Sequence, residues 1–109
     1  MLFLFLLVYV STACASCDCL DRSELGRSTW FLLHEIVKTP QSPAFPSLMW
    51  SLSELYPCEI CRAHISEYLH QNPPIMSEYW MCAFHNVVNV RLGKPEIECI
   101  KDKSILSNE

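Results

Sequence analysis

Glycine is scarce in this chain, because Gly26 and Gly93 are the only glycines among its 109 residues. The phosphate-binding loops of Rossmann domains and P-loop proteins need two or more glycines at short, fixed spacings. The turn that exposes the nucleophilic serine of α/β-hydrolases needs two glycines four residues apart. None of these loops can form here, so a bound nucleotide would have to be held by another kind of fold.

Four segments with the helical spacing of apolar residues follow one another along the chain. Helix-ending signals separate them, among them Pro57, the Pro73-Pro74 pair and Gly93. No segment alternates apolar and polar residues as a strand does, and a short turn of helix is expected after Glu96. The length suits one small domain. The sequence therefore predicts an all-α bundle of four or five helices. The four main helices are expected at residues 23–38, 47–56, 58–71 and 77–92.

The charges give no sign of a nucleic-acid partner. The formal net charge is −4, and the eight Lys and Arg residues are scattered along the chain. A nucleic-acid-binding protein usually gathers such residues on one face. We therefore expect no nucleic acid among the partners.

Residues 1–15 are similar to a targeting leader. Residues 1–10 are apolar throughout, and this run is too short to span a bilayer, which needs about 20 residues. Its length suits a signal peptide, and Ala13-Cys14-Ala15 resembles a small-residue cleavage site. A signal peptide would direct the protein to the secretory lumen, the endoplasmic reticulum. Because no basic residue precedes the apolar run, a membrane-associating anchor and a misplaced start codon stay open as alternatives.

Cysteine is abundant, and this indicates an oxidising compartment or a function based on thiols. The number is odd, so at least one thiol is free, paired between chains or removed with a leader. The seven positions are Cys14, Cys17, Cys19, Cys58, Cys61, Cys82 and Cys99.

The pair Cys58 and Cys61, preceded by Pro57, has three interpretations. A zinc site would need two further ligands, and Cys14 with Cys17, or a histidine of the third helix, would have to supply them. A purely structural disulfide would close too small a loop to be an effective staple. A redox-active pair fits best, because a helix N-terminus stabilises the thiolate. We therefore predict a redox pair and no metal site.

Cys82 and Cys99 lie 17 residues apart, on the fourth helix and in the segment that follows Gly93. A bridge that closes a loop of this size stabilises a fold by about 3 kcal/mol. This spacing favours a structural role for the two cysteines.

The fourth helix carries a second pattern, with Cys82, His85, Asn86 and Asn89 on one stripe. Such a stripe is usually a solvated face, but this one lacks the Glu and Lys that fill solvated faces. Histidine and asparagine offer the directed donors and acceptors that a heteroaromatic ligand requires. On the first helix, Gly26, Trp30 and His34 form a similar stripe. The alternative is that Trp30 is simply a core residue.

Taken together, residues 24–34, 56–61 and 80–99 closely resemble the Erv/ALR family of FAD-linked sulfhydryl oxidases. The likeness extends from residue 21 to residue 99, and the agreement of several motifs in order makes it specific. The resemblance implies an oxidase domain at 23–103, which follows the signal-peptide-like or anchor leader at 1–15 and a flexible cysteine-bearing segment at 16–22, and precedes a tail at 104–109.

The resemblance implies a four-helix bundle with a short fifth helix and FAD inside the bundle. It implies an enzyme that makes disulfides in substrate dithiols and passes electrons through Cys58–Cys61 and the flavin to O2, giving H2O2. Substrates would be protein dithiols or an oxidoreductase carrier, and the protein would be a homodimer. Because relatives also work in the mitochondrial intermembrane space, that compartment is the alternative location.

The resemblance also assigns roles to residues. Cys61 would lie next to the flavin, incoming thiols would attack Cys58, and Cys82–Cys99 would be the structural disulfide. The flavin would be lined by Gly26, Arg27, Trp30, His34, Tyr56, Cys82, His85, Asn86, Val88, Asn89 and Lys94.

A departure from the family pattern after Cys99, and the cysteines before the first helix, each suggest a further hypothesis. The residues after Cys99 include no aromatic side chain, whereas many family members carry an aromatic-rich tail. The alternative function is therefore a disulfide-stapled interaction module that keeps the fold and has impaired catalysis. Cys17 and Cys19 have no visible core role, and we predict that they form a shuttle disulfide that relays electrons from a protein substrate to Cys58. The alternative is that one of the N-terminal cysteines bridges two subunits.

Overall fold

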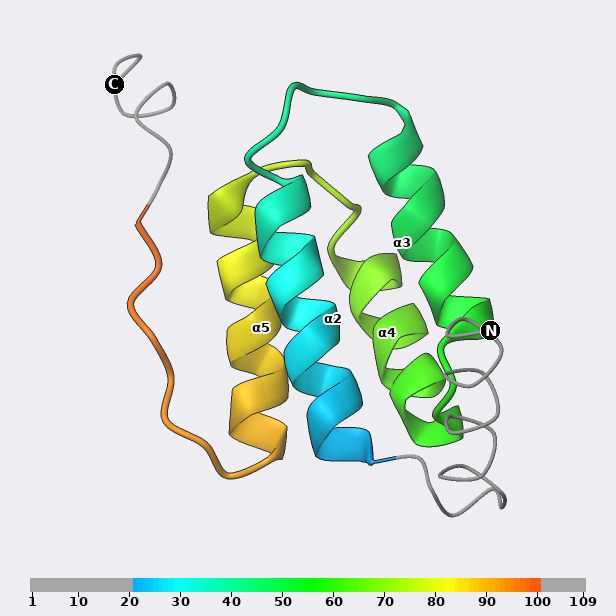
Figure 1. The fold of residues 1–109 in the computed structure, drawn as a ribbon, viewed down its shortest axis with the longest axis vertical. Helices are drawn as coiled ribbons and strands as arrows, with labels where there is room; N and C mark the ends of the chain where they lie inside the picture. The colour runs from blue at the N-terminus through cyan, green and yellow to red at the C-terminus, as the bar shows by residue number, and fades with distance from the viewer. Residues whose placement is uncertain (1–20, 101–109) are drawn as a thin grey trace, which may run out of the picture.

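Four helices make up the computed structural model, which describes residues 21–100 (Figure 1). Residues 21–100 contain no β-strand, and this confirms the expected all-α four-helix architecture. The leader at 1–15, most of the segment at 16–22 and the tail at 104–109 lie outside the described residues. The helices are α2 (Arg22–Ile36), α3 (Ala44–Leu55), α4 (Glu59–Gln71) and α5 (Glu78–Arg91).

Side chains that accept backbone hydrogen bonds set where two helices start. The Asp21 carboxylate accepts from the N–H groups of Ser23 and Glu24, at 3.0 and 3.3 Å, and caps α2. At the start of α5, the Ser77 hydroxyl accepts from the backbone N–H of Trp80 at 3.0 Å. These caps satisfy N–H groups that have no partner inside the helix.

The second helix begins three residues earlier than expected, at Ala44 rather than at residue 47. The prediction placed Pro46 before the helix, but the structure places it in the first turn. A proline is tolerated there because the first N–H groups of a helix make no intrahelical hydrogen bond. The proline therefore does not mark the helix start.

The helices pack as two pairs, α3 with α4 and α2 with α5 (Figure 1). Aromatic rings join the two pairs. Tyr68 of α4 stacks on Phe84 of α5 with ring centroids 4.4 Å apart, and Trp80 of α5 meets Phe45 of α3 edge-on at 5.8 Å. The core thus runs through the whole bundle. Its buried members are Leu33, Val37, Phe45, Met49, Leu69, Met76, Trp80, Met81 and Phe84.

Residues 94–100, which we call the strap, run in an extended conformation beside α5. The short turn of helix expected after Glu96 is not formed within these residues. Gly93 ends α5 with a φ of 72°, and the amide of Asn86 then binds both backbone groups of Ile97. Because Asn86 takes up these groups, they are not available for helical hydrogen bonds. None of the helices within residues 21–100 is long and apolar enough to cross a membrane.

The packing predicts a large effect for a core truncation in α5. Met81→Ala should lower the free energy of unfolding by about 2–5 kcal/mol, because the vacated volume is enclosed on all sides. Met81 has 0% of its surface exposed, whereas Val90 on the same helix has 59% exposed. Urea unfolding followed by circular dichroism measures both, and Val90→Ala should change the value by less than about 0.5 kcal/mol. Equal losses for the two variants would contradict this core.

Candidate active site

Cys58 and Cys61 form a disulfide at the N-terminus of α4. Cys58 is the N-cap residue, and its sulfur accepts a hydrogen bond from the backbone N–H of Cys61 at 3.4 Å. After reduction, the same helix end stabilises a thiolate through its dipole and its unpaired N–H groups. The local geometry is thus that of a dithiol that can be reversibly oxidised.

Two side chains that the sequence analysis missed hold the loop before this disulfide. The Arg62 guanidinium donates to the Tyr56 carbonyl at 2.6 Å, and the backbone N–H of Cys58 donates to the same oxygen at 2.7 Å. The Tyr56 hydroxyl lies 3.1 Å from the hydroxyl of Thr29 on α2. The position of Arg62 directly after Cys61 was a usable signal, but no sequence pattern connects Thr29 to Tyr56. These contacts hold Tyr56, two residues before Cys58, against Thr29, the residue next to Trp30 on α2.

The two cysteines of this disulfide differ in exposure. Cys58 has 5% of its surface exposed, whereas Cys61 is half-buried. The resemblance assigns contact with incoming thiols to Cys58. The residue to which this role is assigned is thus the less exposed of the two, and the assignment stays a prediction.

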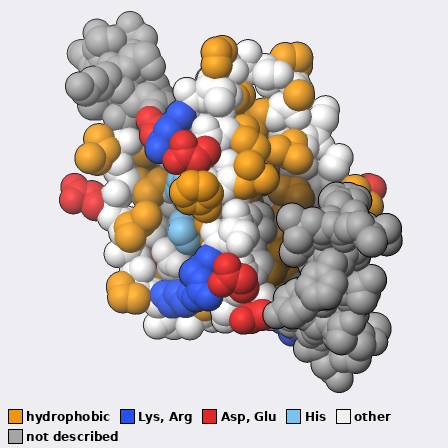
Figure 2. All heavy atoms as spheres, in the orientation of Figure 1, with side chains coloured by type: hydrophobic (Ala, Val, Ile, Leu, Met, Phe, Trp, Pro, Cys, Tyr) orange, Lys and Arg blue, Asp and Glu red, His pale blue; other side chains and the backbone are white. Residues whose placement is uncertain are grey.

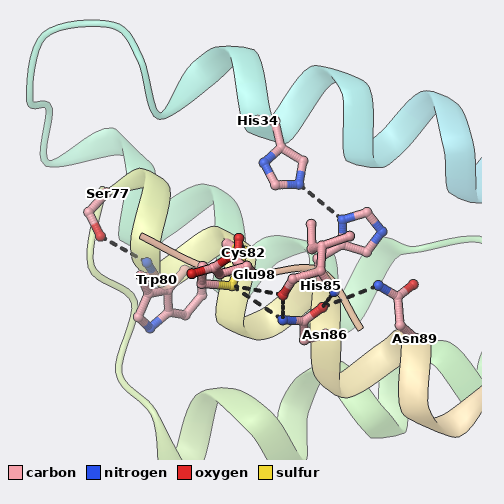
Figure 3. The surroundings of a disulfide bond; sticks show 10 residues. His34, Ser77, Trp80, Cys82, His85, Asn86, Asn89 and Glu98 are labelled. Atoms are coloured by element: carbon pink, nitrogen blue, oxygen red, sulfur yellow. Dashed lines mark hydrogen bonds between the residues drawn. A yellow bond between two sulfur atoms is a disulfide. The ribbon is translucent and has the colours of Figure 1, made fainter. Parts of the chain in front are cut away.

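A cluster of aromatic rings joins α2 to α5. The rings of Trp30 and His85 stack with centroids 4.1 Å apart and planes 9° from parallel. His34 Nε2 lies 3.0 Å from His85 Nδ1, and this hydrogen bond is drawn in Figure 3. The structure thus brings together Trp30, His34 and His85, which the two sequence stripes predicted to share a site.

Burial keeps both imidazoles neutral. Burial is the main cause that lowers the pKa of His34, and the positive charge of Lys38 lowers it further. The negative charges of Glu78 and Glu35 raise this pKa by smaller amounts. The pKa of His85 is also lowered, mainly by burial and then by His34 and Lys94. A pair that shares one hydrogen bond can only form it when one nitrogen accepts. At neutral pH one of these two nitrogens therefore donates and the other accepts, and the tautomers of the two rings decide which.

The two asparagines of the stripe have different roles. The Asn86 amide nitrogen donates to the Ile97 carbonyl at 2.7 Å, and its oxygen accepts from the Ile97 N–H at 2.9 Å (Figure 3). Asn89 has only 7% of its surface exposed, and its amide donates to Asn86 at 3.4 Å. The backbone carbonyl of Asn89 accepts from the N–H of Lys94 at 2.8 Å. Asn86 thus holds the strap, whereas Asn89 is a buried polar group behind it.

The other predicted site residues are placed as follows. Arg27 is exposed and pairs with Glu24 at 2.8 Å, and half-buried Val88 packs against the core. Cys82 and Cys99 form the expected disulfide between α5 and the strap. At Gly26 a Cβ atom would meet nothing within 4 Å, so there is open space beside α2 at this point.

These residues fit a flavin on chemical grounds. Open space at Gly26 allows a flat group to approach the backbone, and the indole of Trp30 offers an aromatic face. Neutral imidazoles and the carboxamide of Asn89 supply directed hydrogen bonds of the kind a heteroaromatic ring accepts and donates. By contrast, residues 21–100 bring together no group of three or more potential metal ligands.

Comparison with known proteins identifies the family. The sequence profile of the Erv1 / Alr family matches residues 27–106, and the chain belongs to this family. The FAD-linked sulfhydryl oxidase ERV1 of Oryza sativa is 41% identical over 92 residues, which are 73% of this chain and 47% of that protein. The mitochondrial FAD-linked sulfhydryl oxidase ERV1 of Saccharomyces cerevisiae is 33% identical over 91 residues, which cover 72% and 48%. The chain thus spans about half the length of these curated relatives.

Solved structures agree with the fold. The crystal structure of the yeast Erv1 core superimposes with a TM-score of 0.67 at 33% identity, covering 73% of this chain and 78% of that one. The crystal structure of the FAD binding domain of Erv1 from Saccharomyces cerevisiae gives a TM-score of 0.66 at 34% identity, covering 73% and 88%.

The imidazole pair predicts acid sensitivity. Because the folded state lowers both histidine pKa values, the unfolded chain binds more protons once the pH falls below the usual histidine pKa of about 6.5. The free energy of unfolding should therefore decrease as the pH is lowered from 8 to 5.5, and urea unfolding at a series of pH values measures it.

The double variant His34→Gln, His85→Gln should reduce the slope of the unfolding free energy against pH. The control His70→Gln removes an exposed imidazole of α4 and should leave the slope close to that of the wild type. A double variant with the full wild-type slope would contradict the prediction.

Proposed function

We propose that this protein is an FAD-dependent sulfhydryl oxidase, which makes disulfides in substrate thiols and passes electrons through Cys58–Cys61 and the flavin to O2, giving H2O2. The observation that carries the proposal is the position of the Cys58–Cys61 disulfide. It lies at a helix N-terminus, and the Tyr56–Thr29 contact ties it to the turn of α2 that carries Trp30. The names of the relatives support the same activity.

The cysteines perform the exchange. A substrate thiolate attacks the sulfur of Cys58, the Cys58–Cys61 bond breaks, and Cys61 leaves as a thiolate at the start of α4. The second substrate thiol, once deprotonated, attacks its own mixed disulfide and releases Cys58, so that the substrate gains a disulfide and the pair gains two electrons. Bound FAD would supply the two-electron acceptor for the reduced pair and the site at which O2 is reduced.

The proposed cofactor site uses the stripes of α2 and α5 and the loop before α4. Trp30 and His85 offer aromatic faces, and His34 and Asn89 offer hydrogen-bonding groups. Asn86 and Cys82 contribute by holding the strap against α5. The full set of proposed flavin-lining residues is Gly26, Arg27, Trp30, His34, Tyr56, Cys82, His85, Asn86, Val88, Asn89 and Lys94.

Variants of the two cysteines test both the cofactor and the roles. The purified protein should be yellow and should consume O2 when dithiothreitol is added. Cys58→Ser should leave Cys61 as a lone thiolate beside the flavin and should add a long-wavelength charge-transfer band to the absorption spectrum. Cys61→Ser should show no such band, and both variants should lose O2 uptake. Equal spectra for the two variants would show that the roles are assigned wrongly.

The burial of Cys58 favours one alternative function, a disulfide-stapled interaction module with impaired catalysis. Such a protein would keep the fold and both disulfides, but it would not turn over. The O2-uptake assay with dithiothreitol separates the two functions, because the module predicts no uptake even when the flavin is bound.

We also propose a homodimer that forms through α2. Phe31 and Leu32 are large apolar side chains of this helix, and Phe31 has 72% of its surface exposed. Figure 2 shows apolar side chains at the surface of this face of the molecule, with charged groups beside them. Burial of such side chains is the main driving force for association.

Phe31→Glu should convert the dimer to a monomer, because it would place a charge in an apolar contact. Sedimentation velocity measures the change in mass. Leu92→Glu is the matched control, since Leu92 is an exposed apolar residue at the end of α5 and should leave the mass unchanged. A dimer that survives Phe31→Glu would exclude this face.

The proposed setting is an oxidising compartment, and the proposed partners are protein dithiols or an oxidoreductase carrier. The leader favours the lumen of the endoplasmic reticulum, whereas the fungal relatives named as mitochondrial favour the intermembrane space. Cell fractionation with N-terminal sequencing of the mature chain distinguishes them. Cys17 and Cys19 are proposed as the shuttle pair that receives electrons from a protein substrate.

A further inference from the structure

The side chain of Arg62 folds back over the start of α4. Its guanidinium donates to the carbonyl of Tyr56 at 2.6 Å, and its backbone N–H donates to the carbonyl of Cys58 at 2.9 Å. The backbone N–H of Cys58 donates to the same Tyr56 oxygen at 2.7 Å, which closes a γ-turn around Pro57. Arg62 therefore holds both ends of the turn that leads into the disulfide, and one carbonyl oxygen joins its guanidinium to the backbone of Cys58.

The start of a helix is an unfavourable place for a cation. A helix carries a partial positive charge at its N-terminus, so cations stabilise its last turn, as Arg91 does in α5. Arg62 instead brings a positive charge to the end of α4 that is already positive. This arrangement is unfavourable while the cysteines form an uncharged disulfide, and it becomes favourable when an anion forms beside it.

The charge of Arg62 is not neutralised by any carboxylate of residues 21–100. The ion pairs in this part of the chain involve other cations, Arg27, Lys38 and Arg91. Glu59, which lies between the two cysteines, is exposed and makes none of these pairs. Arg62 itself is half-buried, and a partly buried charge is screened less than an exposed one. Its electrostatic field therefore acts on the neighbouring cysteines.

We propose that Arg62 is a positioning residue that sets how readily the Cys58–Cys61 disulfide is reduced. Its guanidinium, which the Tyr56 carbonyl holds in place, stabilises the thiolate that forms when the disulfide opens. A pair whose reduced form is stabilised is a stronger oxidant. The inference rests on the proposed function, because it concerns the step in which the pair takes electrons from a substrate.

The reduction step conserves atoms, electrons and charge. A substrate dithiol in its monoanionic form gives two electrons to the pair and closes its own disulfide. The bond between Cys58 and Cys61 breaks, and the pair becomes one thiolate and one thiol, which takes the remaining proton of the substrate. The negative charge thus moves from the substrate to the neighbourhood of Arg62. The guanidinium therefore favours the reduced form of the pair.

The reduction equilibrium of the pair tests the proposal. The wild type and its variants are equilibrated without O2 at fixed ratios of reduced to oxidised dithiothreitol. Alkylation and mass spectrometry of the peptide that contains Cys58 and Cys61 then give the reduced fraction of this pair alone. Arg62→Gln, whose amide can still donate to Tyr56, should lower the equilibrium constant for reduction about tenfold, which corresponds to about 30 mV. Arg62→Lys keeps the charge and should retain most of the wild-type value. An unchanged constant in Arg62→Gln, or an equal loss in Arg62→Lys, would overturn the proposal.

Variants of Glu59 keep the test decisive if urea unfolding shows that Arg62→Gln folds poorly. Glu59→Gln removes the exposed negative charge between the cysteines and should raise the equilibrium constant for reduction. The double variant Glu59→Gln, Arg62→Gln has the wild-type net charge at this site, and its constant should return towards that of the wild type. A constant in Glu59→Gln at or below the wild-type value, or a double variant as low as Arg62→Gln, would contradict control by charge.

Lys38→Gln is the matched control, because it also removes one positive charge. Lys38 follows α2, whose C-terminal end lies at the opposite end of the bundle from the start of α4 (Figure 1). Its equilibrium constant should equal that of the wild type, and a loss as large as in Arg62→Gln would overturn a local effect. The measurement needs neither flavin nor O2. Absence of O2 uptake with dithiothreitol would therefore overturn the proposed function and leave this measurement unaffected.

Discussion

The hydrogen bond between His34 and His85 is the contact on which the candidate site depends. It crosses from α2 to α5 and fixes the register in which the two polar stripes face each other. The same register lets Trp30 lie flat on His85 while its edge meets Phe84 in the core. Because a hydrogen bond between two imidazoles needs at least one neutral nitrogen acceptor, the partial burial that lowers both pKa values also preserves the contact. The packing that partly buries the two imidazoles therefore also keeps the hydrogen bond between them.

Much of the bundle can be predicted from the sequence, because its helix boundaries are marked by residues with local physical effects. Asp21 and Ser77 accept backbone hydrogen bonds, and Gly93 adopts the positive φ that ends α5. Pro46 led to a wrong helix start, because the sequence alone does not distinguish a proline in the first turn of a helix from a proline that precedes the helix. The two stripes are also predictable, since helical spacing alone places their members on one face.

Contacts that depend on tertiary structure could not be predicted in the same way. The pairing of Tyr56 with Thr29 joins residues 27 positions apart, and neither lies in a pattern that points to the other. The hydrogen bonds between Asn86 and the backbone of Ile97 could not be predicted, because an asparagine side chain can bind a ligand or a backbone segment equally well. The burial of Cys58 depends on how neighbouring elements cover it, which the spacing of two cysteines does not report. Sequence patterns thus indicate where the site lies, whereas contacts between distant parts of the chain determine what each residue binds.

The anchoring of the loop before α4 has a consequence for the speed of electron transfer. Arg62 holds the Tyr56 carbonyl from the helix side, and Thr29 contacts the Tyr56 hydroxyl from α2. Neither contact involves a sulfur atom, so both persist whether the disulfide is closed or open. The backbone of this loop is thus held by contacts that do not depend on the disulfide. Anchoring of this kind limits the rearrangement that opening or closing the disulfide requires, and so lowers the reorganisation energy of both steps.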